Sequence, residues 1–574
     1  MDGMKNFDVA KILREIAFFL EMNDVQFKPR AYEKAARSVE ALEDDVDEIY
    51  QKGGIKALLE IPGVGQNIAK KIEELVKTGK LEYYEELKKE APVDLESFTG
   101  IEGLGPKTIK VLWQKLKVKN IDDLEKAALA HRIRSLPGFQ EKSEQKILKG
   151  IEFAKKNKGR HMLGYVLPII HKIENRLSSL PEIKIALVAG SIRRMKETVG
   201  DADFLVISDN SKKVMDFFVS MPEVEDILVK GETKTSVRLK IGMDADIRVL
   251  QEQSFGAALQ YFTGNKDHNI ALRRRAQDMG WKLSEYGLFQ SDRQIAGKTE
   301  EDVYNKLGLQ WIPPELRENN GEIEAAEVNS LPKLIDYGDL RGDLQVHSNW
   351  TDGTNSIKEM ALYAKKIGLE YIVISDHSKS LAMTGGLDEN MILKQASEID
   401  ELNEQLSGIR ILKGVELNIL KDGRLDISDK ILETLDVVGA SIHSHFNLSK
   451  EEMTERALKA IANNNVDIFY HPTGRLIQRR EPIQLDIEKI IEASKDNGTI
   501  LDIDSFPDRL DLKDEHIRKA VKAGAKLGIS SDSHNVLHLH FLELGVAQGR
   551  RGWATAKDVV NTRKLKEFLR MVKS

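Results

Sequence analysis

Beyond about residue 340, the chain repeats one unit: a short apolar strand that ends in side chains able to bind metal, usually followed by a helix-like segment. The strands are YIVISDHS, IRILKGVELN, LDVVGASIHS, VDIFYHP, TILDIDS and KLGISSDSH. Strands that alternate with helices pair in parallel, and the carboxyl ends of parallel strands meet at one edge of a sheet or barrel. We therefore expect a parallel barrel that places its chemistry at this edge.

Histidine and cysteine usage point to the kind of chemistry. Nine of the 13 histidines lie at or after His347, and the 574-residue chain has no cysteine. The lack of thiols excludes disulfides, iron–sulfur clusters, zinc fingers and cysteine nucleophiles. Imidazole and carboxylate ligands at the strand ends favour a Mn²⁺ or Zn²⁺ centre over a Mg²⁺ centre.

The composition is that of a soluble globular protein of about four domains. The net charge is -6, but residues 101–160 carry 15 Lys and Arg against 7 Asp and Glu. A basic block in an acidic chain indicates a polyanion-binding surface. The first residues lack the pattern of a signal peptide, and no apolar run reaches the ~18 residues of a membrane span. We expect a cytoplasmic protein that binds no membrane.

Two segments, IPGVGQNIAKKI at 61–72 and IEGLGPKTIKVL at 101–112, share a hydrophobe, a Gly-x-Gly pair and an amphipathic helix. The glycines permit a tight turn, and the amides at the helix start can face a phosphate oxygen. The pattern resembles the helix-hairpin-helix motif, which holds the DNA backbone. LPGFQEKSEQKI at 136–147 is a degenerate third copy, with Gln140 at the second glycine position. The glycine pairs are Gly63 with Gly65 and Gly103 with Gly105.

Paired carboxylates predict a second kind of metal site. Asp201 and Asp203 follow the motif GSIRR by about ten residues and share one face of a strand. Asp246 lies on another predicted strand, and Asp244 has the same parity but is interpreted as a neighbour. Adjacent carboxylates repel unless cations lie between them, and hard oxygen ligands suit Mg²⁺.

The motifs GSxRR, GDxD, DIR and YFTGNKDHNxxxR, in this order, resemble the family X DNA polymerases over about residues 5–312. The resemblance implies that Asp201, Asp203 and Asp246 hold two Mg²⁺ ions for nucleotidyl transfer. It also implies nucleotide contacts and DNA contacts. The implied nucleotide contacts are Gly190, Ser191, Arg194, Tyr261, Phe262, Gly264 and Asn269, and the implied DNA contacts are Lys28, Tyr32, the four hairpin glycines and Arg273.

The same resemblance raises the hypothesis of a 5′-deoxyribose phosphate lyase. Lys71 stands where lyases of the family have a lysine that forms a Schiff base. Such a lysine must be neutral to attack an aldehyde, which burial or nearby cations favour. Asn67 replaces a supporting lysine, so the alternative of a merely solvated Lys71 stays open.

The C-terminal motifs GDLQVHSNWTDG, ISDHS, GVE, SIH, HPTGR and SDSH resemble the PHP domain over about residues 340–574. The resemblance implies three bound metal ions, which we expect to be Mn²⁺ or Zn²⁺. Gln345 stands where the family has the first histidine of His-x-His, so one ion is expected to bind more weakly or to be lost. Arg475 is expected to hold a phosphate, and His445 to be a solvent-facing residue. The matching ligands are His347, Asp352, His377, Glu416, His443, His471, Asp532 and His534.

Together these patterns predict a multidomain α+β and α/β chain: a helix-hairpin-helix region, a mixed-sheet nucleotidyltransferase palm with a thumb, and a (β/α)7-like PHP barrel. The expected divisions are an N-terminal helical domain at 1–90, a fingers-like domain at 91–158, a palm at 159–252, a thumb at 253–316, a linker at 317–338 and a PHP domain at 339–574.

The leading hypothesis is a monomeric repair polymerase that fills short gaps. Its substrates would be gapped or primed DNA and deoxynucleoside triphosphates. The PHP domain would act as a 3′–5′ exonuclease, with cleavage at abasic sites as a further hypothesis. Two alternatives remain: a DNA-binding protein whose PHP domain has decayed to a structural role, and a PHP phosphomonoesterase that acts on small metabolites.

Overall fold

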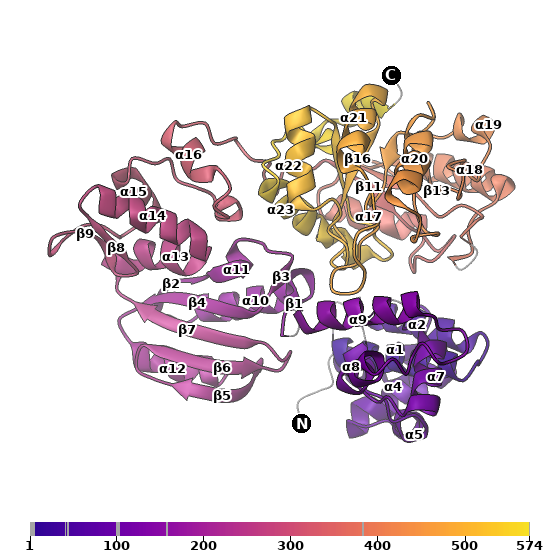
Figure 1. Ribbon diagram of the computed structural model, residues 1–574, viewed down its shortest axis with the longest axis horizontal. Coiled ribbons are helices and arrows are strands. Elements are labelled where there is room, and N and C mark those ends of the chain that lie inside the picture. Colours follow the sequence, from indigo (N-terminus) through magenta and orange to yellow (C-terminus); the bar gives the residue numbers. More distant parts are fainter. Residues whose placement is uncertain are drawn as a thin grey trace.

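The computed structural model describes residues 6–40, 42, 45–98, 101, 104–156, 159–381 and 384–572. Figure 1 shows a helical N-terminal region, a palm sheet with a small helical thumb, and a C-terminal barrel. No helix in these ranges has the length and apolarity that a membrane crossing requires. The predicted order of helical, mixed-sheet and parallel-barrel regions is confirmed.

Nine helices of the described chain form the N-terminal region around one apolar core. Gly65 and Gly105, both with extended backbone, immediately precede the second helix of each predicted hairpin, and Pro106 occupies a first-turn position where its missing N–H removes no bond. The helices are α1 (Asn6–Met22), α2 (Lys28–Glu40), α3 (Val46–Leu59), α4 (Gln66–Thr78), α5 (Glu82–Glu90), α6 (Leu95–Phe98), α7 (Pro106–Leu116), α8 (Ile121–Leu129) and α9 (Glu141–Lys156).

The palm is a five-stranded sheet in the order β2-β4-β7-β6-β5, in which β4 and β7 run parallel and the other pairs antiparallel. Alternate residues of β6 and β7 are buried, as the period of a half-buried strand requires. The palm elements are β1 (His161–Met162), α10 (Leu163–Ser178), β2 (Ile183–Val188), α11 (Gly190–Arg193), β3 (Thr198–Val199), β4 (Asp201–Ser208), α12 (Ser211–Val219), β5 (Val224–Lys230), β6 (Lys234–Leu239) and β7 (Asp244–Leu250).

The thumb follows, and the segment 317–338 packs on it rather than hanging as an extended linker. Arg317 is fully buried against Glu300, and Glu322 is fully buried with its carboxylate 2.6 Å from His268 Nδ1. The elements are η1 (Glu252–Ser254), α13 (Phe255–Thr263), α14 (Lys266–Asp278), β8 (Lys282–Ser284), β9 (Gly287–Gln290), β10 (Arg293–Ala296), α15 (Glu300–Lys306), η2 (Pro314–Leu316) and α16 (Glu322–Glu327).

Seven parallel strands, in sequence order, form the C-terminal barrel. It is nearly closed, since Val346 and Ser533 form a parallel bridge between the first and last strands. The strands are β11 (Gly342–Val346), β12 (Tyr371–Ile374), β13 (Arg410–Asn418), β14 (Val437–Ser441), β15 (Ile468–Phe469), β16 (Ile500–Asp504) and β17 (Leu527–Ser530). The helices are α17 (Ile357–Lys366), α18 (Glu389–Gln405), α19 (Asp429–Leu432), α20 (Lys450–Ile461), α21 (Ile487–Asn497), α22 (Asp514–Ala523), η4 (Val536–Phe541), α23 (Leu542–Arg551), η5 (Val560–Thr562) and α24 (Leu565–Val572).

Candidate active sites

The three palm carboxylates lie on neighbouring parallel strands. Asp203 of β4 stands directly opposite Asp246 of β7, and Asp201 lies two residues before Asp203 on the same face. Burial raises the pKa of Asp203 to about 6, with further contributions from the charges of Asp201 and Asp246. The structure therefore brings the three predicted residues near enough to repel one another.

Two cationic side chains offset part of this negative charge. Lys234 Nζ lies 2.6 Å from Asp246 Oδ2, and Arg248 approaches the same oxygen at 4.0 Å. Asp244, the first residue of β7, instead pairs with the partly exposed Arg238 of β6. The pairing of Asp244 supports its interpretation as a neighbour of the site rather than a member.

The segment 190–197 leads from the sheet to the proposed triphosphate contacts. Gly190 has a φ of 65°, which favours glycine, and a Cβ at this position would lie 3.2 Å from Asp203 Oδ2. Ser191 follows it in the short helix α11. The glycine thus keeps the approach to the carboxylates open.

Arg194 lies in the middle of this segment, directly after α11, and its guanidinium is already hydrogen-bonded. Its Nε donates to Glu318 Oε1 at 3.1 Å, and its Nη1 donates to the backbone oxygen of Thr263. Gly264 stands directly beside it, since a Cβ there would lie 3.2 Å from Arg194 Nη1. A triphosphate that binds Arg194 must therefore compete with Glu318.

The YFTG segment forms the C-terminal end of α13. The rings of Tyr261 and Phe262 meet edge to face at 5.2 Å, and the guanidinium of Arg248 lies 4.6 Å from the Phe262 ring centroid. Asn269 donates to the backbone oxygen of Tyr261 at 2.7 Å, and Arg273 Nε donates to the backbone oxygen of Asn269 at 3.3 Å. These implied contact residues of α13 and α14 are thus connected by hydrogen bonds and ring contacts.

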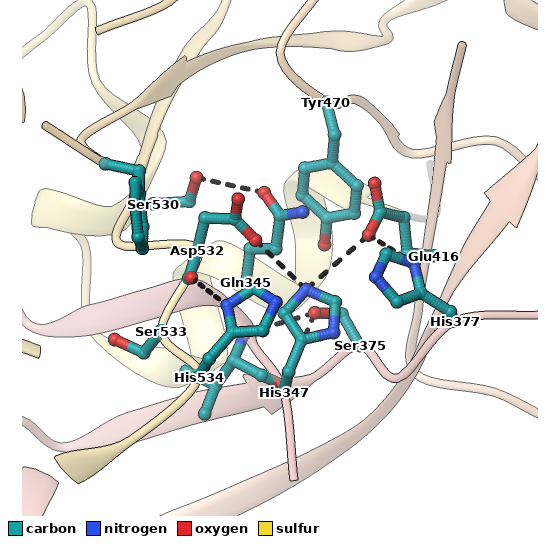
Figure 2. Close-up of polar contacts among 12 residues, drawn as sticks. Gln345, His347, Ser375, His377, Glu416, Tyr470, Ser530, Asp532, Ser533 and His534 are labelled. Atoms are coloured by element: carbon teal, nitrogen blue, oxygen red, sulfur yellow. Dashed lines mark hydrogen bonds and ion pairs between the residues drawn. The ribbon is translucent and has the colours of Figure 1, made fainter. Parts of the chain in front are cut away.

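The predicted ligands of the barrel lie at or just beyond the carboxyl ends of its strands. Figure 2 shows five of them close together: His347, His377, Glu416, Asp532 and His534. Two groups place one donor atom per residue within 4.8 Å of each other: His347, Asp352, His377 and His534 form one, and His377, Glu416 and His443 form the other. They are the compact donor groups of this kind among the residues that the structure describes. The palm triad is more open than either.

Glu416 on β13 is the centre of the second group. Its Oε1 lies 2.8 Å from His471 Nε2 and 3.1 Å from His443 Nε2, and its Oε2 lies 3.0 Å from His377 Nδ1. His347 Nε2 lies 3.1 Å from Asp532 Oδ1, which joins the last strand to the first. All of these side chains are buried or nearly so.

Burial and the neighbouring charges shift the pKa values of the barrel histidines in opposite directions. Burial alone would lower the pKa of His377, but Glu416 and Asp352 outweigh it and raise this pKa to about 9. Burial lowers the pKa of His443 to about 4, although Glu416 opposes the shift. The buried nitrogens His347 Nδ1 and His471 Nδ1 have no hydrogen-bond partner within the described residues. Orphaned donors of this kind fit bound metal, because buried polar atoms otherwise find partners.

Gln345 is fully buried on β11, at the position where the resemblance leads one to expect a histidine. Ser530 Oγ donates to its Oε1 at 3.3 Å, while its Nε2 has no partner among the described residues. The sequence analysis did not anticipate Arg509, whose Nε lies 3.5 Å from Asp532 Oδ2 and 3.4 Å from Asp504 Oδ2. The available signal was its position four residues after the end of the TILDIDS strand.

Arg475 does not lie free to hold a phosphate, so that expectation is wrong. Its guanidinium is almost fully buried and forms a bidentate ion pair with Glu197 of the palm, at 2.5 and 3.1 Å. The partner lies 278 residues away, which no local motif reveals. His445 is exposed, as expected.

The hairpin glycines that the structure describes, Gly63, Gly65 and Gly105, are exposed to solvent. Gly63 has a φ of 79°, and both Gly65 and Gly105 lie exposed at helix starts, where unpaired amides can face an anion. Gly103 lies outside the described residues. Lys28 opens α2 and is exposed, while Tyr32, four residues on, is largely buried.

Lys71 lies half-buried on α4, with its Nζ 4.5 Å from the centroid of the Tyr83 ring. Burial lowers the pKa of Lys71; Glu74 opposes this shift and Lys28 adds to it. Lys28 therefore lies close enough to Lys71 to affect its pKa.

Four family models match the chain. They are a helix-hairpin-helix domain at 4–81, a SAM-like helix-hairpin-helix tandem at 95–152, the DNA polymerase beta thumb at 258–318 and the PHP domain at 343–523. The second of these spans the degenerate third hairpin as well as the segment 101–112.

The chain is 38% identical over 569 residues to the DNA polymerase/3′–5′ exonuclease PolX of Bacillus subtilis, which covers 98% of both chains. A probable phosphatase of a Thermoanaerobacter species is 32% identical over 228 residues, 38% of this chain and 88% of its own. A probable phosphatase of Acetivibrio thermocellus is 35% identical over 188 residues, 31% of this chain and 73% of its own. This chain belongs to the family X DNA polymerases that carry a C-terminal PHP domain.

Proposed function

We propose that the protein fills short gaps during DNA repair by adding deoxynucleotides to a primer 3′-hydroxyl, and that its PHP domain trims DNA ends as a 3′–5′ exonuclease. The observation that carries the proposal is the coexistence of two separate acidic centres on one chain, the palm triad and the barrel cluster. The similarity to a polymerase/exonuclease over 98% of the chain supports the same conclusion.

In the palm, Asp201, Asp203 and Asp246 would hold two Mg²⁺ ions. Such ions activate the attacking hydroxyl and stabilise the leaving pyrophosphate. Arg194 and Ser191 would bind the triphosphate, and the edge-to-face pair of Tyr261 and Phe262 would lie against the sugar. The hairpin glycines, with Lys28, would hold the DNA backbone through phosphate contacts that carry no sequence information.

In the barrel, eight side chains would hold three ions, for which imidazole and carboxylate ligands favour Mn²⁺ or Zn²⁺. A metal centre of this kind supplies a hydroxide nucleophile at neutral pH. Arg509, half-buried beside Asp532, is placed to neutralise part of the charge of a bound phosphodiester. The same chemistry would allow cleavage at abasic sites.

The chief alternative is a decayed PHP domain that only braces the polymerase, for which Gln345 is the motive. The intact grouping of the remaining ligands, with their orphaned buried nitrogens, argues against decay. The second alternative, a phosphomonoesterase of small metabolites, draws on the partial similarity to probable phosphatases and leaves the helix-hairpin-helix motifs without a role.

One labelled primer on gapped DNA tests these functions together. With Mg²⁺ or Mn²⁺, Asp203→Ala should abolish extension and leave shortening intact, and His377→Ala should do the reverse. A decayed PHP domain predicts no shortening in the wild type and substoichiometric Mn or Zn by elemental analysis. A phosphomonoesterase predicts hydrolysis of a free phosphate ester in the absence of DNA.

A further activity, 5′-deoxyribose phosphate lyase, is favoured by the half-buried position and lowered pKa of Lys71. Borohydride trapping on a substrate with an incised abasic site tests it, since a Schiff base to Lys71 becomes a stable adduct on reduction. Lys71→Ala should lose the adduct, and Lys70→Ala, its exposed neighbour, should keep it. An adduct that persists in Lys71→Ala would exclude this residue as the nucleophile.

A further inference from the structure

The barrel and the palm are joined by buried ion pairs rather than by a loose contact. Arg475 binds Glu197 on both guanidinium nitrogens, and Gln548 of α23 donates to the same carboxylate at 2.7 Å. Glu197 lies three residues after Arg194, at the end of the segment that carries the implied triphosphate contacts. The PHP domain therefore holds one end of the nucleotide-binding segment.

Arg551, the last residue of α23, contacts the middle of the same segment, at Arg194. Its side chain is only 1% exposed. Its Nη1 donates to the backbone oxygen of Arg194 at 3.2 Å and lies 3.4 Å from Glu318 Oε1, while its Nη2 binds Asp514. One guanidinium thus links the palm, the segment after the thumb and the PHP domain.

Glu318 is the shared partner of this arrangement. Its Oε1 accepts from Arg194 Nε at 3.1 Å and contacts Arg551, while its Oε2 lies 3.5 Å from Lys196 Nζ. Burial would raise the pKa of Glu318, but Lys196, Arg551 and Arg194 outweigh burial and lower it. The carboxylate is therefore charged at neutral pH, and the two arginines share one of its oxygens.

We propose that Arg551 is a positioning residue for triphosphate binding at the palm. Because Arg551 shares the charge of Glu318, it weakens the hold of that carboxylate on Arg194 and frees Arg194 for the incoming triphosphate. Its bond to the Arg194 backbone fixes where this side chain starts. The inference rests on the proposed polymerase function and adds to it a nucleotide-affinity role for a residue of the PHP domain.

Arg551→Met should raise KM for the incoming nucleotide about tenfold in single-nucleotide gap extension. Without Arg551, the charged hydrogen bond between Glu318 and Arg194 becomes stronger, and it competes with the triphosphate for Arg194. The value of kcat should change less than about twofold, because Arg551 touches no reacting atom. Arg551→Lys should fall between Met and wild type. Adding Glu318→Gln to Arg551→Met should return KM toward the wild-type value, because the competing charge is gone.

Arg550→Met is the matched control. Arg550 also ties α23 to the polymerase half, through Glu315 at 2.7 Å, but its hydrogen bonds to Glu315 and to the backbone oxygen of Ile335 involve neither Arg194 nor Glu318. It should lower thermal stability without raising KM. Primer shortening by each variant, in the absence of nucleotides, reports whether the PHP domain is intact.

An unchanged KM in Arg551→Met overturns the proposal, and so does a raised KM that Glu318→Gln fails to restore, because a merely structural brace predicts no such rescue. If Arg551→Met does not fold, Arg551→Lys and Glu318→Gln alone decide: the first must raise KM and the second must not. Failure of wild-type protein to extend gapped DNA would instead reject the proposed function itself.

Discussion

The pKa of Asp203 gives a sharp test of the palm site. This carboxyl titrates at about 6 rather than 3.8, first because it is buried and then because Asp201 and Asp246 lie near it. Mg²⁺ requires the ionised form. At pH 8 the group is ionised, whereas at pH 5 about nine-tenths of it carries a proton, so Mg²⁺ affinity should be about tenfold weaker at pH 5 than at pH 8.

Calorimetric titration of Mg²⁺ should show this loss, together with release of about one proton per palm site filled at pH 5 and none at pH 8. Asp203→Asn removes the titrating group, so the difference between the two proteins isolates the palm from the PHP centre. Asp244→Asn is the control, since Asp244 lies on the same strand but pairs with Arg238. Equal pH dependence in wild type and Asp203→Asn would refute the assignment of the low-pH proton to this site.

Three further outcomes concern the barrel. Glu416→Gln should abolish primer shortening but keep primer extension. Elemental analysis should find less bound metal, because losing a direct ligand should weaken metal affinity by more than the about 10–100-fold seen when a residue that only contacts a ligand is changed. Gly439→Ala should unfold the barrel or lower its melting temperature by several degrees, since a Cβ there would lie 1.8 Å from the Tyr470 ring, whereas Gly338→Ala has open space and should be neutral. In metal-free protein, the pKa of His377 is about 9 in the folded state, which is above its value in the unfolded chain. Its pairing therefore stabilises the fold fully below about pH 6.5, and this stabilisation is lost as the pH rises through 9. Thermal melts of wild type and His377→Ala across this range check the prediction.

Sequence reasoning located the site residues where the determining signal was local. Asp201 and Asp203 share a face because a strand has period two, and His377 and Glu416 meet because successive parallel strands end at the same edge. The distance along the chain between such ligands does not matter, since the repeated strand–helix unit fixes where each strand ends.

Other features depended on partners that no local pattern encodes. Arg475 follows a ligand motif and has the right chemistry for a phosphate, but Glu197 neutralises it across the domain junction. Likewise, the polar sequence of 317–338, with its Pro and Gly residues, predicts a linker, but Glu322 within it is buried against His268. A buried ion pair shows only when both partners are placed in space.

The two centres also differ in how far they are assembled before any ion binds. Glu416 already lies within about contact distance of several imidazoles in a buried pocket, so the ligands need little rearrangement and the metal can stay between substrates. The palm carboxylates repel one another, and Lys234 occupies Asp246. A nucleoside triphosphate would add its own anionic oxygens to these carboxylates, so we expect the palm to bind its ions more weakly before the nucleotide arrives. We therefore expect the supply of nucleotide, rather than competition for metal, to decide whether a primer end is extended or trimmed.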